Sequence, residues 1–491
     1  MMNIVSFRVD ASSRIGYGHV MRCAALAEVL AARGADIRFI CRELAGDYCD
    51  ALEDLGFRVH RLPEQNAGLA DDIAQTRSAL AATDVSDWLV VDHYALDARW
   101  EQAMRTSARR ILVIDDLADR THDCDLLLDQ NFTTESANRY FGLTATDTCL
   151  LLGPRYALLR PEFGQRRKQR HSHDGSVRRV LICFGGADPQ QHTLATLNAL
   201  RTHAGRLDQI DIVIGLANTH REAIVAACVT LHNATLHCPA PDISALLAAT
   251  DLAIGAGGSM NWERACLGVP TLAFGIADNQ RQVMASLIEA GYVAGIPYMS
   301  SPDEARIAAW ITCLLDNPAL LRGLSVRSAT LVDGRGAGRV ADALLPVALT
   351  FRRATLKDSD NLLTWRNDPA IRGVSLNSHE IERKTHEEWL QRTLADPQRI
   401  LLVAESQGQS VGVIRFDLLP PEAVISVYRI PLAEAPGGLI RQATDWLRTQ
   451  HPEILRIRAE LLPHNTASLA AFRSAGYRDA RNTLVIELDR P

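Results

Sequence analysis

Apolar and polar positions follow two alternating periods along about the first 160 residues. Short apolar runs alternate with segments whose apolar residues recur at helical spacing. This alternation predicts an α/β fold with a mostly parallel, doubly wound sheet. The predicted strands are Ile4–Val9, Asp36–Cys41, Arg58–Leu62, Trp88–Asp92, Arg110–Asp115 and a short one from Leu126; the predicted helices are Val20–Ala31, Asp47–Leu55, Ala70–Ala82 and Asp97–Thr106.

A second series of the same kind follows a basic stretch, residues 164–176, which lacks apolar periodicity and is predicted to connect two lobes. The series starts with the apolar run from Arg179 to Phe184. Its further strands are predicted at Gln209–Ile214, Thr235–His237, Leu252–Gly255 and Thr271–Phe274, with helices at Gln190–Thr202, Thr219–Val229, Ile243–Ala249, Met260–Cys266 and Gln280–Ala290. Two tandem doubly wound lobes indicate a two-Rossmann architecture.

The pattern changes again from Phe351 onward, where strands and helices are mixed and cysteine is absent. Strands are predicted at Ile400–Glu405, Val411–Asp417, Val424–Arg429 and Ile457–Leu461, with helices at Gly437–Thr449 and from His464. We therefore predict three domains: residues 1–163, 164–348 and 349–491.

Composition narrows the class of protein. A formal charge of −6 over 491 residues gives no indication of nucleic acid or a membrane surface as partner. The ten cysteines show no CxxC spacing and several lie in apolar runs, which favours reduced, buried thiols in a cytoplasmic protein over disulfides or zinc. The N-terminus has no signal-peptide pattern, and no apolar run is long enough to span a membrane.

The loop after the first strand carries the first candidate chemistry. Gly16, Tyr17, Gly18 and His19 precede the first predicted helix. Glycines let the backbone approach a ligand closely, helix-start amides favour an anion, and histidine transfers protons near neutral pH. A glycine turn with a capping histidine is the alternative.

Polar residues also end two later strands of this lobe. Asp92 and Tyr94 follow the fourth strand, and Asp115 ends the fifth. Because ligands of doubly wound sheets bind beyond the carboxyl ends of the strands, these residues are predicted to border the same crevice as His19. Polar strand ends that merely satisfy loops are the alternative.

The second lobe repeats the strand–glycine–helix arrangement at Gly257, Gly258 and Ser259. Its helix-start amides suit a diphosphate, and Ser259 can cap the helix or bond a phosphate oxygen. Glu263, four residues on, could accept ribose hydroxyls or sit in an ion pair. Two further pairs border the predicted crevice: Asn279 and Gln280 after the next strand, and Gly185 and Gly186, which contact the diphosphate or merely turn.

Several motifs together resemble the UDP-sugar hydrolases of pseudaminic acid biosynthesis. They are Gly-Tyr-Gly-His-Val-Met-Arg-Cys at 16–23, Val-Asp-His-Tyr at 91–94, Ile-Asp-Asp-Leu at 114–117, Leu-Leu-Gly-Pro-Arg-Tyr-Ala-Leu-Leu-Arg at 151–160, and Gly-Ala-Gly-Gly-Ser with Trp-Glu-Arg-Ala-Cys-Leu-Gly-Val-Pro within 255–270. The resemblance covers about residues 3–345. It implies a fold like the two-lobed (GT-B) glycosyltransferases.

The resemblance further implies metal-free hydrolysis of UDP-2,4-diacetamido-2,4,6-trideoxy-β-L-altropyranose to UDP and the free sugar. UDP leaves readily once helix-start amides hold its charge, so the remaining task is to activate a water. His19 is the predicted base. Asp92, Tyr94 and Asp115 are predicted to orient the sugar or the histidine, and the resemblance adds Arg22 and Arg160 as substrate contacts.

The last domain resembles GNAT acetyltransferases. Asn-x-x-Ser-x-x-x-Phe-x-x-x-Gly-Tyr at 465–477 carries the resemblance, and Trp-Arg-Asn at 365–367 resembles the branch that acetylates the 4-amino group of a UDP-sugar. The resemblance implies acetyl-CoA as cosubstrate, with its pyrophosphate at Gly437 and Gly438 and Asn465 near the pantetheine. Residues 432–436 lack the usual basic or glutamine start, and Phe472 replaces a common tyrosine.

Two hypotheses follow for the whole chain. In the first, the C-terminal domain acetylates a UDP-4-amino sugar and the lobes hydrolyse the product. In the second, the lobes transfer the sugar to an acceptor and the C-terminal domain is a non-catalytic sugar-binding or assembly module. The sequence leaves the oligomeric state and the sugar stereochemistry open.

Overall fold

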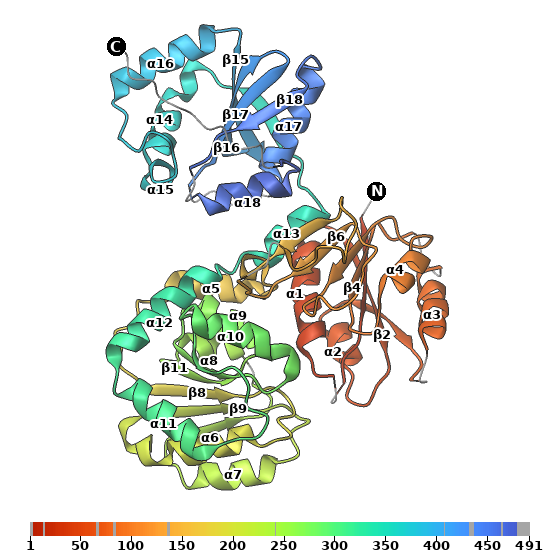
Figure 1. Ribbon diagram of the computed structural model, residues 1–491, viewed down its shortest axis with the longest axis vertical. Coiled ribbons are helices and arrows are strands. Elements are labelled where there is room, and N and C mark those ends of the chain that lie inside the picture. The colour runs from red at the N-terminus through yellow and green to blue at the C-terminus, as the bar shows by residue number, and fades with distance from the viewer. Residues whose placement is uncertain are drawn as a thin grey trace, which may run out of the picture. The chain divides into compact units, whose positions relative to one another are not determined.

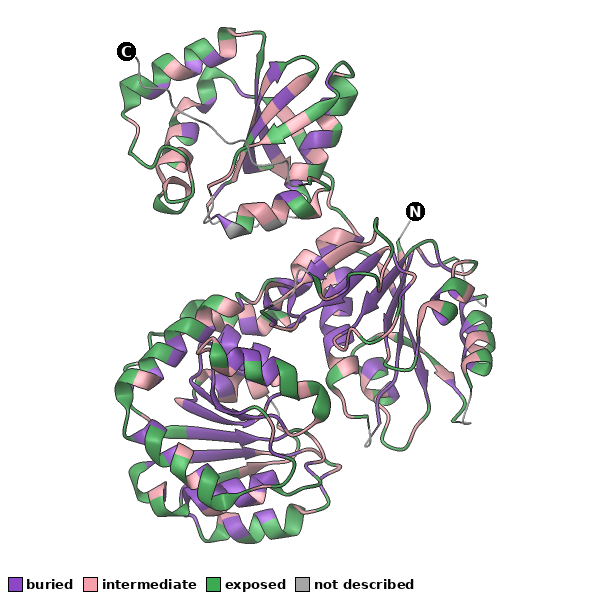
Figure 2. Ribbon diagram, in the orientation of Figure 1, coloured by how far each residue is buried: buried purple, intermediate pink, exposed green. Residues whose placement is uncertain are grey.

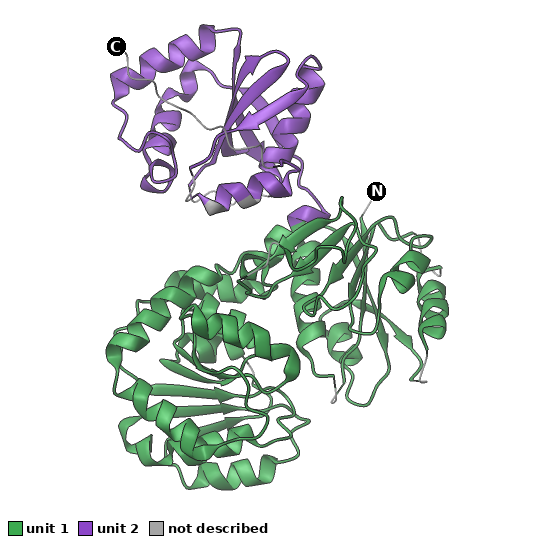
Figure 3. Ribbon diagram, in the orientation of Figure 1, with its two compact units in different colours: residues 1–341 green, residues 342–491 purple. Residues whose placement is uncertain are grey.

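The computed structural model describes residues 3–12, 15–64, 68–81, 85–134, 138–240, 242–406, 408–431, 437–462 and 465–478. The chain forms two compact units, residues 1–341 and 342–491 (Figure 3). The first unit contains both predicted lobes. The boundary lies inside helix α13 (Gly336–Leu344), slightly before the predicted one at residue 349.

The first lobe is a seven-stranded parallel sheet in the order β3-β2-β1-β4-β5-β6-β7 (Figure 1). Its strands are β1 (Ile4–Val9), β2 (Asp36–Arg42), β3 (Arg58–Leu62), β4 (Trp88–Asp92), β5 (Ile111–Ile114), β6 (Leu126–Asp129) and β7 (Cys149–Leu152); its helices are α1 (Gly18–Ala32), α2 (Cys49–Asp54), α3 (Leu69–Ala81) and α4 (Ala98–Met104). The strands β4, β5 and β6 are buried along their whole length (Figure 2), as expected where helices cover both faces of a sheet.

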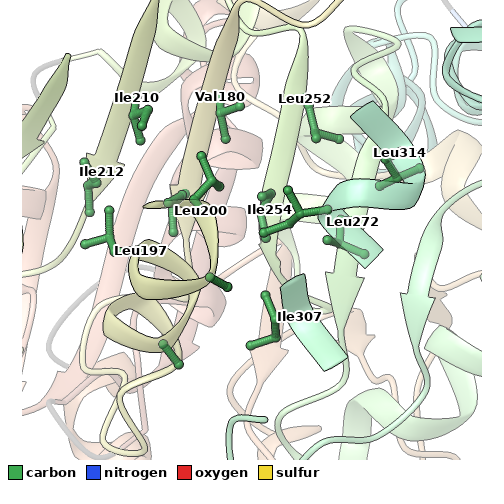
Figure 4. Packing of buried hydrophobic residues seen from close by; sticks show 14 of the residues in the cluster. Val180, Leu197, Leu200, Ile210, Ile212, Leu252, Ile254, Leu272, Ile307 and Leu314 are labelled. Carbon is green, nitrogen blue, oxygen red and sulfur yellow. The ribbon is translucent and has the colours of Figure 1, made fainter. Parts of the chain in front are cut away.

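The second lobe is a six-stranded parallel sheet in the order β10-β9-β8-β11-β12-β13. Its strands are β8 (Arg179–Cys183), β9 (Gln209–Val213), β10 (Ala234–His237), β11 (Leu252–Ala256), β12 (Thr271–Phe274) and β13 (Ala294–Ile296). Its helices are α6 (His192–Leu200), η3 (Arg201–Arg206), α7 (Arg221–Val229), α8 (Ile243–Ala248), α9 (Met260–Cys266), η4 (Asp278–Gln280), α10 (Arg281–Glu289), α11 (Glu304–Leu315) and α12 (Pro318–Leu331). One face packs Val180, Ile254 and Leu272 against α6 and α11 (Figure 4).

In both sheets the strand order reverses beside the first strand of the lobe. β1 lies between β2 and β4, and β8 lies between β9 and β11. A crevice opens at such a switch point, outside the carboxyl ends of the two diverging strands. The loops after β1, β4, β8 and β11 therefore occupy the binding positions of their sheets. Two tandem Rossmann-like lobes are thus confirmed as the fold class, while β7 and β13 were not predicted.

The basic stretch at 164–176 lies between the two sheets, as predicted, but it contains helical structure that the sequence pattern did not predict. Its first half belongs to helix α5 (Pro161–Gln169), preceded by the short turn η2 (Pro154–Tyr156). Arg167 donates to the carbonyls of Cys266 and Ala329, and Arg170 donates to those of Leu247 and Thr250. Arginines thus satisfy carbonyls at the C-terminal ends of other helices, which apolar periodicity cannot reveal.

The second unit is built on a five-stranded mixed sheet in the order β14-β15-β16-β17-β18. Its strands are β14 (Thr350–Arg353), β15 (Arg399–Ser406), β16 (Gln409–Leu419), β17 (Glu422–Arg429) and β18 (Arg456–Ala459); its helices are η5 (Leu356–Asp358), α14 (Ser359–Asn367), α15 (Pro369–Arg372), α16 (Arg383–Ala395), α17 (Leu439–Gln450) and α18 (Thr466–Ser474). Only the pair β17–β18 is parallel. One face of the sheet packs against α17, and the other packs against α14 and α16.

Leu314→Ala tests the core of the second lobe. Leu314 is fully buried in α11, so the substitution leaves a cavity and should lower the free energy of unfolding of the first unit by about 2–5 kcal/mol in chemical denaturation. Val326→Ala on α12, where the valine is 66% exposed, should change it by no more than about 0.5 kcal/mol. Equal effects of the two substitutions would contradict this packing.

Candidate active site

His19 lies at the start of α1, where its ring is held by the carboxylate that ends β4. His19 Nδ1 and Asp92 Oδ1 are 2.6 Å apart. The remaining ring nitrogen, Nε2, makes no hydrogen bond to a residue that the structure describes. With Nδ1–H donating to Asp92, Nε2 carries the lone pair that can accept a proton.

Arg22, one helical turn after His19, donates two hydrogen bonds to the same carboxylate. Nε donates to Asp92 Oδ2 at 2.6 Å and Nη2 to Oδ1 at 2.7 Å. Asp92 is 1% exposed, and although burial alone would raise the pKa of its carboxyl, Arg22 and His19 hold that pKa well below its usual range. Asp92 is therefore a permanent anion that fixes the ring of His19.

Tyr94 and Asp116 complete the first-lobe side of the group. The ring of Tyr94 meets that of His19 edge to face, with centroids 4.6 Å apart. Asp116 Oδ2 accepts from Arg22 Nη1 at 3.1 Å. Burial, with the Asp116 charge next, raises the pKa of the Tyr94 hydroxyl, so Tyr94 stays a neutral phenol.

The second lobe meets this group at three places. Asn279 Nδ2 donates to the Tyr94 hydroxyl at 3.2 Å. A Cβ built on Gly18 would lie 3.6 Å from Ser259 Oγ, and one built on Gly186 would lie 3.4 Å from the Tyr17 ring. Tyr94, Gly18 and Tyr17 of the first lobe therefore lie beside Asn279, Ser259 and Gly186 of the second.

The turn between β11 and α9 is closely packed at Gly257, where a side chain would displace Met284. A Cβ on Gly257 would lie 2.4 Å from the Met284 side chain, and one on Gly258 would lie 3.4 Å from Gln280 Nε2. Ser259 makes no side-chain cap of α9, so its hydroxyl is not used as the predicted cap. Buried Arg264 donates to the Ala256 carbonyl at 2.6 Å, which ties the base of this turn to its own helix.

Glu263 lies behind this turn in a setting that favours its protonated form. Burial raises the pKa of its carboxyl to about 7, against the opposing influence of Arg160 and Arg264. Arg160 itself pairs with Glu162 at 3.0 Å. Arg160 and Glu263, predicted separately from distant motifs, are thus brought together by the fold.

Asp115 is the predicted residue that the structure places elsewhere. Its side chain is fully buried, pairs with Arg120 at 2.9 Å and accepts from the Tyr140 hydroxyl at 3.0 Å. Its neighbour Asp116 is the one that reaches Arg22. The adjacent aspartates indicated a functional position, but the sequence did not show whether Asp115 or Asp116 points toward Arg22.

In the second unit, the predicted pyrophosphate loop at 432–436 lies outside the described residues. Of its flanking glycines, Gly437 donates its N–H to the Asp342 carboxylate, and Gly438, with φ of +81°, precedes α17. Asn465 caps α18 by accepting from the Ser468 N–H at 3.1 Å. The strands β17 and β18 pair as far as Ile425 and Ala459, after which β17 continues to Arg429 with β16 as its partner among the described strands.

Within the described residues, no group of three or more histidine, cysteine, aspartate or glutamate side chains is arranged to hold a metal ion. None of the described helices is long and apolar enough to cross a membrane.

Comparisons with known proteins assign both parts of the chain to known relatives. Residues 348–478 match the acetyltransferase (GNAT) domain model, and residues 202–293 match a family of unknown function, DUF354. The UDP-2,4-diacetamido-2,4,6-trideoxy-β-L-altropyranose hydrolase of Campylobacter jejuni is 26% identical over 60% of this chain and 99% of its own length. The resemblances predicted from the motifs are therefore confirmed.

Two further comparisons concern the architecture. An uncharacterized protein of Methanocaldococcus jannaschii, MJ1062, is 20% identical over 97% of both chains, so its match spans both units. The crystal structure of Medicago truncatula UGT71G1 complexed with UDP-glucose covers 70% of this chain and 98% of its own, with a TM-score of 0.50 and 12% identity. The latter supports the two-lobed fold alone.

The raised pKa of Glu263 predicts a pH-dependent stability. Because the folded-state pKa of about 7 exceeds the ordinary value of 4.5, the stabilisation is complete below about pH 4.5 and is lost as the pH rises through 7. Between pH 5 and 7.5 the wild type should lose on the order of 2 kcal/mol of unfolding free energy relative to Glu263→Gln, measured by urea denaturation. Glu289→Gln, at an exposed residue, should follow the wild-type profile. Coincident profiles for the wild type and Glu263→Gln would contradict the raised pKa of Glu263.

Proposed function

We propose that this chain catalyses two successive reactions. It joins a region similar to a UDP-sugar hydrolase to a GNAT acetyltransferase domain. The first unit hydrolyses UDP-2,4-diacetamido-2,4,6-trideoxy-β-L-altropyranose to UDP and the free sugar, a step of pseudaminic acid biosynthesis. The second unit N-acetylates the UDP-4-amino sugar that precedes this substrate. The observation that carries the first proposal is the His19–Asp92 contact of 2.6 Å at the crevice between the lobes.

His19 acts as the base for the attacking water. Water attacks the anomeric carbon, its proton passes to Nε2, and the bond between that carbon and the β-phosphate oxygen breaks. Asp92, ionised and held by Arg22, stabilises the imidazolium that forms and keeps the ring in one orientation. Attack opposite the departing UDP inverts the anomeric centre.

The second lobe binds the leaving group. Gly257, Gly258 and Ser259 bring backbone amides to the crevice, where they can hold the charge that develops on the diphosphate. Arg160 and Glu263 are proposed to bind the nucleoside part, with Glu263 accepting hydrogen bonds from the ribose hydroxyls. Tyr94 and Asn279, joined across the crevice, are proposed to position the sugar between the two halves.

In the second unit, the sugar amine attacks the thioester carbonyl of acetyl-CoA. The amide C–N bond forms, the C–S bond breaks, and CoA leaves as the thiol with the proton that the amine loses. The end of β17–β18 pairing after Ile425 leaves the β17 backbone from Ser426 onward free of β18 for contacts with the cosubstrate. The match of residues 348–478 to the GNAT domain supports acetyl-CoA in this role.

His19→Ala tests the hydrolysis. With the purified diacetamido UDP-sugar and no added acceptor, wild type should release UDP, and the variant should do so about 10²–10⁴-fold more slowly, as followed by a coupled UDP assay. His232→Ala, at an exposed histidine of the second lobe, is the matched control and should be unaffected. UDP release that requires an added acceptor would overturn hydrolysis in favour of a glycosyltransferase.

The same variant separates the two reactions. Given acetyl-CoA and the UDP-4-amino sugar, wild type should yield the free diacetamido sugar, whereas His19→Ala should accumulate the acetylated UDP-sugar, both identified by mass spectrometry. Accumulation shows that the second unit works while the first is blocked. Unchanged UDP-4-amino sugar with both proteins would contradict acetylation and leave the second unit as a binding module.

A further inference from the structure

Two arginines of the second unit have buried donors without a partner among the described residues. Arg366 lies in the last turn of α14 (Ser359–Asn367), and Arg372 is the last residue of α15, which follows α14 after Asp368. Arg366 Nη1 and Arg372 Nε are both buried and lack a hydrogen-bond partner among the described residues, and neither guanidinium forms an ion pair with a carboxylate there. In the same domain Arg352, by contrast, pairs with Asp358 and Glu405.

These two cations are close enough to influence each other. Burial and the charge of Arg372 both lower the pKa of Arg366. Two partly desolvated guanidiniums with unused donors cost free energy, and an arginine fork matches phosphate oxygens in geometry and charge. A dianion between them would satisfy the free donors and remove the repulsion.

The face of the sheet identifies which anion this is. Tyr428, on β17, influences Arg366 electrostatically and packs with Trp365 in the cluster beneath α14 and α16. The next residue back, Val427, packs on the opposite face, with Leu439 of α17. The pyrophosphate of acetyl-CoA is proposed to lie at the start of α17, so the arginine pair occupies the other face of the same strand.

We propose that Arg366 and Arg372 bind the diphosphate of the nucleotide-sugar acceptor of the second unit. The proposal rests on the proposed acetylation of a UDP-linked amine, and it gives this chain a second site for UDP, separate from the crevice of the first unit. Both the UDP-sugar and CoA carry a nucleoside diphosphate that two arginines could bind. Because the arginines lie on the face of the sheet opposite α17, we assign the site to the UDP-sugar.

Arg366 also holds a neighbouring loop in place, which makes it unsuitable as the variant to test. Its Nη2 donates to the Asn377 carbonyl at 2.7 Å, and neighbouring Asn367 exchanges two hydrogen bonds of 2.9 Å with the Ile381 backbone. Removing Arg366 would therefore loosen the loop from Val374 to Ile381 as well as remove a charge. Arg372 forms no such side-chain bond within the described residues, so Arg372→Gln tests the charge alone.

Calorimetric titration of the full chain with UDP counts the sites. Wild type should bind two equivalents and Arg372→Gln one. Arg383→Gln is the matched control, because Arg383 is exposed, lies on α16 and pairs with Asp360; it should keep both sites. Two equivalents retained in Arg372→Gln, or a single equivalent in wild type, would overturn the proposal, and this result does not depend on whether acetylation occurs.

Steady-state kinetics then distinguish the two sources of diphosphate. Arg372→Gln should raise KM for the UDP-4-amino sugar at least about tenfold, since one charge-assisted contact is lost. The KM for acetyl-CoA and UDP release from the diacetamido substrate should stay at wild-type values. An increase in the KM for acetyl-CoA instead would assign the arginines to CoA and reject the proposed site.

Discussion

The first unit depends on one buried carboxylate, Asp92. It ends β4 at the switch point of the sheet and is 1% exposed, where an unpaired anion would cost several kcal/mol. Arg22 and His19, both from the first turns of α1, compensate that cost with hydrogen bonds of 2.6 and 2.7 Å. The hydrogen bonds that stabilise the buried Asp92 carboxylate therefore also orient His19, the proposed base.

Close backbone approach is the second constraint on this crevice. Gly18 of the first lobe lies beside Ser259 of the second, and Gly186 of the second lobe lies beside the ring of Tyr17 of the first. Each lobe thus has a glycine at a point where the other lobe approaches it closely. Parallel strands bring their carboxyl ends to one edge, which places both sets of turns at the switch points of their sheets. A diphosphate ester bound there would meet amides from one lobe and the histidine from the other.

Fusion of the two units gives the proposed reactions a common polypeptide. In the proposed scheme the acetylated product of the second unit is the substrate of the first, and tethering would raise the local concentration of that intermediate without a channel. MJ1062 of Methanocaldococcus jannaschii aligns with this chain across both units. Under both proposals the same diphosphate is bound twice, by helix-start amides in the first unit and by Arg366 and Arg372 in the second.

The sequence alone determined the order of the elements, the two-lobed fold and most of the first-unit group, because apolar periodicity and glycine-rich turns act locally along the chain. It identified His19, Asp92 and Tyr94 through their positions after strands. Whether Asp115 or Asp116 is buried depends on contacts that no periodicity reveals: Arg120 pairs with Asp115, and Tyr140, 25 residues further along the chain, donates to it. Helix α5 was missed for the same reason, since its arginines dock on the ends of other helices. Only the tertiary structure decided these points, because charge pairing and desolvation depend on neighbours that the local pattern does not contain.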